Sequence, residues 1–246
     1  MTENRENKEL GSAERKFSVS IFFPCYNEAE NIESVVVRAV EVVSAVSDDF
    51  EVIIVDDGSS DGTREIADRL EADIKQVSVI HHEQNSGYGR ALQSGFRAAA
   101  KELVFYTDGD GQFDISEMPP LLELIDDYDI VSCYRLDRKE GPVRKLNAWC
   151  WGKLVCLVFR MNLRDIDCAF KLYKRKIFDD IKMQSTGALI DAEILARALN
   201  KGYTIVQTGV HHYPRTAGKS TGAKISVIFR AFKELLRLRK DIIRQS

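Results

Sequence analysis

The stretch Leu103-Val-Phe-Tyr-Thr-Asp-Gly-Asp-Gly-Gln112 joins an apolar run of strand length to two aspartates separated by one residue. In an extended chain residues i and i+2 point to the same side, so Asp108 and Asp110 can face one small volume beyond the strand. Two carboxylates that close repel each other unless a cation lies between them. As an isolated pattern, however, Asp-x-Asp is more typical of an acidic turn with solvated side chains. The rest of the chain must decide between these interpretations.

The composition is that of an ordinary globular protein. The 246 residues are 44% hydrophobic and 30% charged, which fits one large α/β domain with a real core. A net charge of −3 argues against binding nucleic acid through global charge. The five cysteines are odd in number and show no Cys-x-x-Cys spacing, which favours the cytoplasm over a disulfide framework or zinc. No run approaches the ~18 apolar residues of a membrane span.

Strands and helices alternate through the first half of the chain. Apolar runs of strand length lie at 17–23, 50–55, 77–81 and 103–106. Stretches with helical periodicity separate them, at 30–46, 63–70 and 86–99. Such alternation with short connections predicts a mostly parallel, Rossmann-like sheet with helices on both faces. Ligands of such sheets bind at the carboxyl ends of the strands, and polar clusters follow three of these strands, at 24–28, 56–61 and 108–112.

The second half is less regular. Further strands are predicted at 128–134, 164–173 and 203–210, and helices at 142–161, 188–200 and 224–244. The glycine-rich segment 216–222 is predicted to be a mobile loop. Because no linker or repeat interrupts the pattern, we expect one domain over 17–222, a disordered lead-in over 1–16 and a terminal helical segment over 223–246.

Six segments together resemble the family 2 glycosyltransferases of the GT-A fold, in particular dolichyl-phosphate mannose synthases and bacterial polyprenyl-phosphate sugar transferases. They occur in the family's order at 23–28, 55–63, 85–89, 108–112, 165–171 and 215–220. The resemblance implies a nucleotide-diphosphate sugar donor, a polyprenyl phosphate acceptor, and Mg²⁺ or Mn²⁺ to stabilise the leaving diphosphate. Ala169 and Lys171 depart from the glycine and arginine that are usual at these places.

The resemblance also assigns roles to individual residues. The expected metal ligands are Asp108, Asp110 and Gln112. The expected contacts to the nucleotide sugar are Pro24, Tyr26, Asn27, Glu28, Asp57, Gly87, Asp108 and Asp110. The diphosphate and the acceptor phosphate are expected to meet Arg135, Arg138, Arg144, Arg215, Lys219 and Ser220, since guanidinium forks suit phosphate oxygens. Asp110, Arg135 and Arg215 are the expected catalytic residues.

The acceptor determines whether a catalytic base is needed. A phosphate monoester is already ionised near neutral pH and can attack without one, whereas an inverting transfer to a hydroxyl needs a carboxylate. With a lipid phosphate acceptor, the acidic residues of the second half would orient sugar hydroxyls or hold arginines; these are Asp165, Asp167, Asp191 and Glu193. Asp61 is expected to cap a helix. The four histidines are assigned no catalytic role.

The final helical stretch, 224–244, carries seven basic and two acidic residues between apolar ones. A basic amphipathic helix can lie in a membrane interface, at the cytoplasmic face. It can equally pack on the sheet or form a homo-oligomer, and a separate subunit could provide anchoring. For the helix with Trp149 and Trp151, burial in the core is the favoured interpretation.

These observations predict a metal-dependent, inverting glycosyltransferase that moves a sugar from a nucleotide diphosphate to a polyprenyl (dolichyl or undecaprenyl) phosphate, with no nucleic-acid partner. Three alternatives remain. The first is a soluble family 2 transferase that acts on a glycan hydroxyl. The second is a non-catalytic nucleotide-sugar sensor. The third, a nucleotidyltransferase, is disfavoured because no glycine- and lysine-rich loop follows the first strand.

Overall fold

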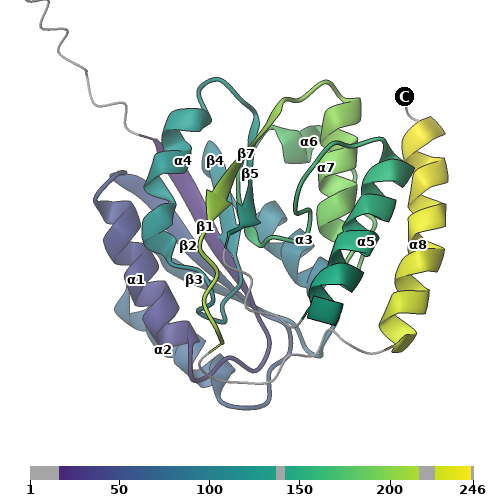
Figure 1. Cartoon of the computed structure of the whole chain (residues 1–246). Helices are drawn as coiled ribbons and strands as arrows, with labels where there is room; N and C mark the ends of the chain where they lie inside the picture. Colours follow the sequence, from purple (N-terminus) through teal and green to yellow (C-terminus); the bar gives the residue numbers. More distant parts are fainter. Residues whose placement is uncertain (1–16, 137–141, 216–224, 245–246) are drawn as a thin grey trace, which may run out of the picture.

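The computed structural model describes residues 17–136, 142–215 and 225–244 (Figure 1). Within these residues one seven-stranded sheet has the order β3-β2-β1-β4-β6-β5-β7. The strands are β1 (Ser18–Cys25), β2 (Asp49–Asp56), β3 (Val77–His81), β4 (Leu103–Thr107), β5 (Ile130–Arg135), β6 (Phe170–Lys174) and β7 (Ile205–Val210). This arrangement confirms the predicted α/β fold with a mostly parallel sheet.

Strand β6 is antiparallel to both of its neighbours, β4 and β5, whereas the other pairs are parallel. Because the strand direction reverses between β4 and β6 and again between β6 and β5, β5 and β7 run parallel to β4. The carboxyl ends of both parallel blocks therefore open on one edge of the sheet. The strand predicted over 164–173 begins only at Phe170, because Asp165 turns to bind Arg135 instead of joining the ladder.

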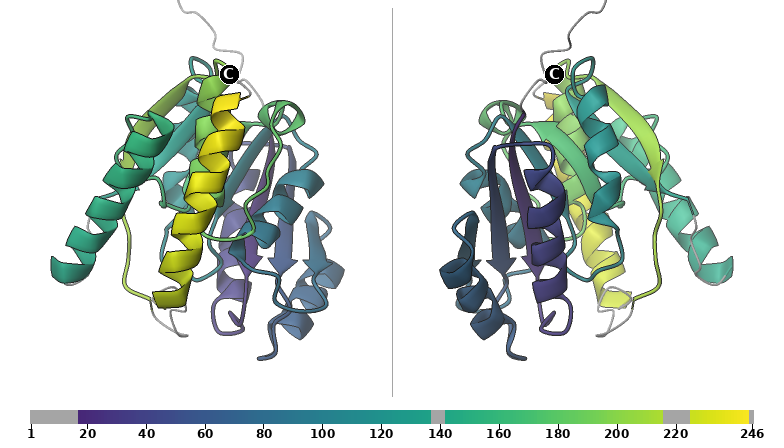
Figure 2. Two further views of the ribbon diagram at one scale, coloured as in Figure 1. Left: turned by 90° about the vertical axis from the view of Figure 1, so that its right-hand side faces the viewer. Right: turned by 90° about the vertical axis from the view of Figure 1, so that its left-hand side faces the viewer.

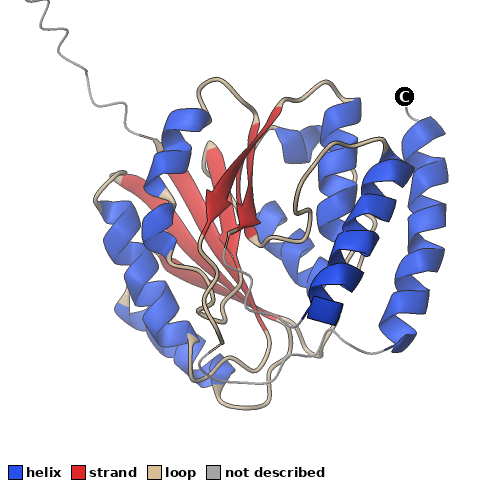
Figure 3. Ribbon diagram, viewed as in Figure 1, coloured by secondary structure: helices blue, strands red, loops and turns tan. Residues whose placement is uncertain are grey.

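Helices cover both faces of the sheet (Figure 3). One face carries α1 (Ile32–Ser44), α2 (Thr63–Asp73), a 3-10 turn at Ile115–Glu117 and the short α4 (Pro119–Leu124). The other carries α3 (Tyr88–Ala98), α5 (Pro142–Phe159), α6 (Ile177–Asp180), α7 (Ile190–Asn200) and α8 (Ile225–Arg244). The sequence interpretation missed α4 and α6, which are too short to show a clear helical period.

Aromatic rings fill the core between the sheet and α3. Phe22 of β1 stacks on Tyr106 of β4 with ring centroids 5.4 Å apart, and Phe96 of α3 meets Phe22 edge-on at 4.8 Å. Burying each such ring stabilises the fold by about 1.5–3 kcal/mol, to which edge-to-face pairs add about 0.5–1.5 kcal/mol. The close packing requires Gly95, where an added Cβ would lie 2.2 Å from the Phe22 ring. The strand that carries Asp108 is thereby held rigidly.

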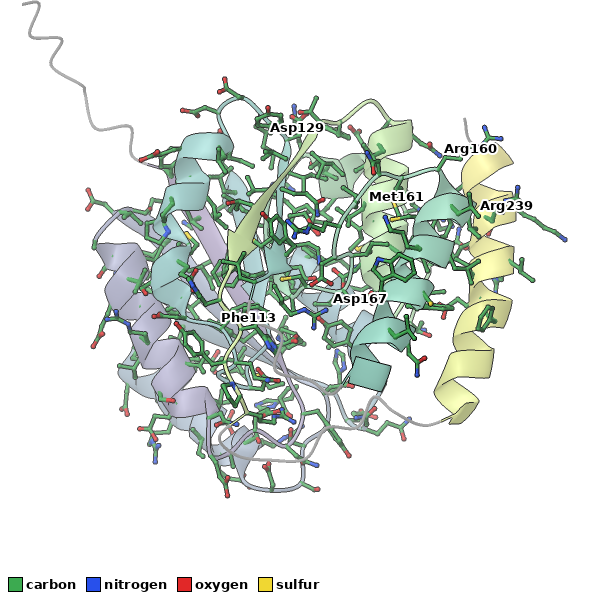
Figure 4. The ribbon with its side chains drawn as sticks, viewed as in Figure 1. Phe113, Asp129, Arg160, Met161, Asp167 and Arg239 are labelled. Atoms are coloured by element: carbon green, nitrogen blue, oxygen red, sulfur yellow. The ribbon has the colours of Figure 1, made fainter. Side chains whose placement is uncertain are left out.

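At the amino ends of β5 and β7, on the edge of the sheet opposite the site, Asp129 links the two strands (Figure 4). Its Oδ2 accepts hydrogen bonds from the Thr204 N–H and hydroxyl at 3.0 Å, and Lys174 donates to Oδ1 at 3.2 Å. Withdrawal from water alone would raise the pKa of Asp129, but these hydrogen bonds outweigh it and lower the pKa to about 2. The ionised carboxylate therefore stabilises the fold.

Helix α8 packs one face on the protein, with Leu235, Leu238 and Ile242 buried in the core shared with α7. Phe232 of α8 meets Trp151 of α5 with ring centroids 5.0 Å apart, and Figure 2 shows the two helices on the same side of the molecule. No helix among the described residues is both long and apolar enough to cross a bilayer. The expected loop 216–222 and lead-in 1–16 lie outside the described residues.

Candidate active site

The loop after β4 is held against the end of β1. The Gly109 N–H donates to the Pro24 carbonyl at 3.4 Å, and an added Cβ at Gly109 would lie 2.5 Å from the Cys25 sulfur. Glycine is therefore required at this position. The Tyr88 hydroxyl, at the start of α3, donates to Asp108 Oδ1 at 3.0 Å. The loop thus presents Asp108 and Asp110 at the edge where the strands end.

Asp108 and Asp110 form an electrostatically strained pair. Withdrawal from water, and then the charge of Asp110, raise the pKa of Asp108 to about 7. A divalent cation between the two carboxylates would relieve this repulsion, so the donor set fits Mg²⁺ or Mn²⁺. Within the described part of the chain, no group of three or more His, Cys, Asp or Glu side chains is arranged so that it could hold a metal ion by itself. The remaining coordination positions would therefore fall to other oxygens, such as those of phosphate or water.

Gln112 ties this loop to the segment that follows β7. Its main-chain carbonyl accepts from the Tyr213 N–H at 2.8 Å, and its side-chain amide donates to the Tyr213 carbonyl at 3.0 Å. Beside it the Phe113 and His212 rings meet with centroids 5.0 Å apart. The expected role of Gln112 as a metal ligand stays a prediction, and the contact that the structure gives it is structural.

This docking brings Arg215 into the site. Its Nη2 lies 3.4 Å from Asp110 Oδ2 and also donates a hydrogen bond to Glu28 Oε1. Arg215 and Asp110, both expected to be catalytic, are thus brought together although they lie in different halves of the chain. Lys219, Ser220 and Arg138 lie outside the described residues, and Arg144 belongs to α5 but its side chain is not described.

The segment after β1 is braced by the loop after β2. Asn27, at a left-handed φ of 57°, donates its N–H to Ser59 Oγ at 2.9 Å and accepts from the Ser60 N–H at 2.8 Å. Tyr26 remains 39% exposed, so its ring is available to a ligand. Asp61 accepts from the Thr63 N–H at the first residue of α2, but the N-cap residue of this helix is Gly62, so Asp61 binds the helix start from one position before the expected cap.

Asp57 has a set of partners that sequence reasoning missed. Its carboxylate accepts from the N–H groups of Ser86 and Gly87, at 2.9 and 2.8 Å, and lies 2.6 Å from His82 Nδ1. The other His82 nitrogen is 2.9 Å from Ser94 Oγ. Asp57 therefore holds the loop before α3 in place, and contact with the donor's base stays a prediction. The available signal was that two adjacent histidines, 81 and 82, lie at the end of one predicted strand and two adjacent aspartates, 56 and 57, lie at the end of the preceding strand.

Separate from the Asp108 loop, a cavity lies between β5, α5 and the loop before β6. This cavity of about 460 Å³ is lined in part by Tyr134, Arg135, Trp149, Lys153, Arg164 and Asp167. Arg135 donates two hydrogen bonds to Asp165, from Nε and Nη2, each at 2.8 Å. This bidentate pair fixes the guanidinium at the cavity wall. Figure 4 shows Asp167 beside α5, to the right of Phe113.

The acidic residues of the second half differ in their surroundings. Lys171, fully buried, donates to Asp191 Oδ1 at 2.8 Å, and the same oxygen accepts from the Tyr106 hydroxyl. Glu193 accepts from buried Arg197 at 2.8 Å. Only Asp167 is exposed; nearby protein atoms that displace water, and then the Asp191 charge, raise its pKa to about 6. The expectation that these acids hold arginines is thus confirmed for Asp165 and Glu193, whereas Asp191 pairs with a lysine.

Comparison with known proteins agrees with this geometry. The model of the family "Glycosyl transferase family 2" matches residues 20–182. Glycosyltransferase AglD of Haloferax volcanii is 33% identical over 207 residues, which cover 80% of this chain and 33% of the relative, so the chain spans about a third of that protein.

Two solved structures share the fold. Glucosyl-3-phosphoglycerate synthase from Mycobacterium tuberculosis, in complex with UDP, superposes with a TM-score of 0.71 at 17% identity, over 98% of this chain and 86% of that one. Mannosyltransferase PcManGT from Pyrobaculum calidifontis, in complex with GDP-Man and Mn²⁺, gives 0.65 at 20% identity, over 90% and 65%. The fold is that of the GT-A glycosyltransferases, and the protein belongs to glycosyltransferase family 2.

Proposed function

We propose that the protein is a metal-dependent, inverting glycosyltransferase that moves a sugar from a nucleotide diphosphate to a polyprenyl phosphate at a membrane surface. The observation that carries the donor half of this proposal is the meeting of Asp108, Asp110 and Arg215 at the carboxyl edge of the sheet. Two carboxylates that repel each other need a cation, and a guanidinium beside them suits a diphosphate.

The divalent metal would be held by Asp110, with Asp108 beside it, and would neutralise the charge that develops on the leaving diphosphate. Side chains of the protein would make the remaining contacts with the donor. Arg215 would donate hydrogen bonds to diphosphate oxygens, and the exposed Tyr26 ring would face the base. The Tyr88 hydroxyl holds Asp108 in position. PcManGT was solved with GDP-Man and Mn²⁺, which supports the same chemistry for this chain.

The acceptor half rests on the cavity beside α5. Its wall carries the fixed Arg135 guanidinium together with Lys153 and Arg164, which suits an acceptor phosphate. Next to it α5 exposes a stripe of apolar side chains, with Leu146, Trp149 and Leu157 between 58% and 77% accessible. The expected burial of this helix in the core therefore holds for Trp151, which packs against the core, and is wrong for Trp149. Tryptophan and leucine beside lysine are typical of a membrane interface. A lipid chain could therefore leave the cavity along α5 while its phosphate stays at Arg135.

Transfer to a glycan hydroxyl is the second candidate, and Asp167 is the observation that favours it. This carboxyl lies on the cavity wall, is reached by solvent and has a pKa of about 6, which suits a general base near neutral pH. A phosphate acceptor would not need it, because a phosphate monoester is already ionised. The two candidates therefore differ in their dependence on one side chain.

The test combines donor binding with turnover. Thermal unfolding with UDP-, GDP- and CDP-linked sugars, with and without Mn²⁺, should show a stabilisation that needs both metal and one type of base. With that donor, turnover is measured on a polyprenyl phosphate in vesicles and on soluble glycans. We expect Asp110→Asn to abolish transfer and Asp167→Asn to retain it with the lipid.

Three outcomes would contradict this. Loss of turnover in a folded Asp167→Asn protein, with a glycan as working acceptor, would favour hydroxyl transfer. Binding of the nucleotide sugar without any transfer or hydrolysis would indicate a sensor. The absence of a metal-dependent stabilisation with every donor would refute the donor half.

A further inference from the structure

Arg215 contacts two carboxylates that come from different loops. Its Nη2 donates to Glu28 Oε1 and lies 3.4 Å from Asp110 Oδ2. The Arg215 side chain is 21% exposed, and Glu28 and Asp110 are 9% and 14% exposed, so water screens these charges only partly. One guanidinium therefore occupies the carboxylate on which the proposed metal would bind.

Glu28 is held more firmly than either of its neighbours in this contact. Its Oε2 accepts from the Asn31 side-chain amide at 2.8 Å, and its N–H donates to Thr63 Oγ1 at 2.8 Å. Its carbonyl accepts from the N–H groups of Asn31 and Ile32, both at 2.9 Å, where α1 begins. The main chain of Glu28 is thus fixed where α1 begins and its side chain is held by Asn31, which suits an anchor for the guanidinium.

Arg215 is less completely satisfied. Its Nε is buried and has no hydrogen-bond partner among the described residues. A buried donor without a partner is costly, which favours a state in which an incoming oxygen reaches it. The segment that carries Arg215 is tied through Tyr213 to Gln112, so it stays next to the metal loop when ligands arrive. The guanidinium can then change partners by a small rotation.

We propose that Glu28 is the positioning residue for Arg215 and thereby decides whether Asp110 faces a guanidinium or a divalent cation. This inference rests on the proposed metal-dependent function. A dication bound to Asp110 repels Arg215. When Arg215 leaves Asp110, its contact with Glu28 keeps the guanidinium beside the metal site. The diphosphate then replaces Asp110 as the second anion on Arg215. Glu28 thus serves catalysis through Arg215, whereas the family resemblance placed it among the direct contacts to the nucleotide sugar.

The test is a double-mutant cycle on the binding of Mn²⁺ alone, followed by the electron paramagnetic resonance of free Mn²⁺. Removing the competing cation with Arg215→Met should tighten Mn²⁺ binding about tenfold. Glu28→Gln leaves Asp110 as the main anion for Arg215, so the guanidinium competes harder and Mn²⁺ binding weakens about threefold. In the Glu28→Gln/Arg215→Met protein the effect of Glu28→Gln should vanish, because no guanidinium remains to be positioned.

The matched control is Glu33→Gln in the first turn of α1, whose carboxylate pairs with Arg69 on the surface. This variant should bind Mn²⁺ as the wild type does, and thermal unfolding checks that all variants are folded. If Glu28→Gln weakens binding equally with and without Arg215, Glu28 acts only as a nearby charge or a structural brace, and the inference is wrong. An Mn²⁺ affinity that is the same in Arg215→Met and in the wild type would also refute the inference. Failure of the wild type to bind Mn²⁺, with or without UDP or GDP, would overturn the proposed function as well.

Discussion

Replacing Lys171 by methionine tests the buried ion pair that lies behind the metal loop. Lys171 is fully buried on β6, and its ammonium group donates to Asp191 and, at 3.1 Å, to the Tyr106 hydroxyl. Methionine has nearly the same length and shape, so the substitution removes the charge without opening a large cavity. The Asp191 carboxylate then remains buried, with the Tyr106 hydroxyl as its partner.

The expected cost follows from that uncompensated charge. Removing one partner of a buried pair typically costs about 3–5 kcal/mol, whereas replacing both by apolar groups of similar volume is often neutral. For a domain of this size, each 1 kcal/mol lowers the melting temperature by roughly 2–4 °C. Lys171→Met should therefore lower it by about 10 °C, and Lys171→Met/Asp191→Leu should regain most of that loss.

Thermal unfolding followed by circular dichroism gives the melting temperatures of both variants, and an unchanged m-value in urea shows that the same surface unfolds. An equal midpoint for Lys171→Met and the wild type would refute the reasoning. So would a double variant as unstable as the sum of its two single changes.

Three further predictions concern other parts of the molecule. Since the pKa of Asp129 is about 2 against an ordinary value of 3.8, it contributes stability above pH ~4 that is lost as pH falls towards 2. Asp129→Asn should reduce this change in the free energy of unfolding, measured by urea unfolding across the window, by at most about 2 kcal/mol, since solvent screens part of the interaction. Gly109→Ala should weaken nucleotide-sugar binding at least about tenfold in calorimetry, because the added methyl group overlaps the Cys25 sulfur, whereas Gly152→Ala, which meets nothing within 4 Å, should leave binding unchanged. Asp165→Asn should raise the KM for the acceptor about tenfold and leave that for the donor unaltered, because it releases the guanidinium at the cavity wall; equal changes in both would contradict the separation of donor and acceptor sites.

The parallel part of the sheet could be predicted from sequence because its signal is local. The strand Leu103–Thr107 begins with a continuous apolar run, 103–106, and ends just before Asp108, which marks both its limits and the side on which a ligand binds. The reversal of β6 could not be predicted, since the direction of a strand depends on how its connection packs and not on its own residues. The short helix Pro119–Leu124 falls below the length at which a period can be recognised.

Individual site residues were predictable where a motif carried them, and their partners were not. Asp110 and Arg215 were expected in one site, and the structure places them together. The contact of Arg215 with Glu28 joins residues 187 positions apart, and no spacing rule reports such a contact. The Lys171 pair had a usable signal, because a lysine between Phe170 and Leu172 on a buried strand requires an anion nearby.

The reversed strand has a consequence for the order in which the chain can fold. β4 is complete at residue 107, but its second neighbour, β6, begins only at residue 170. During synthesis from the N-terminus, β1 to β4 can therefore assemble while the open edge of β4 still lacks its partner. An unpaired apolar edge is a template for association with other chains. We expect truncations that end before residue 170 to aggregate, and the arrival of β6 to be the step that protects the nascent protein.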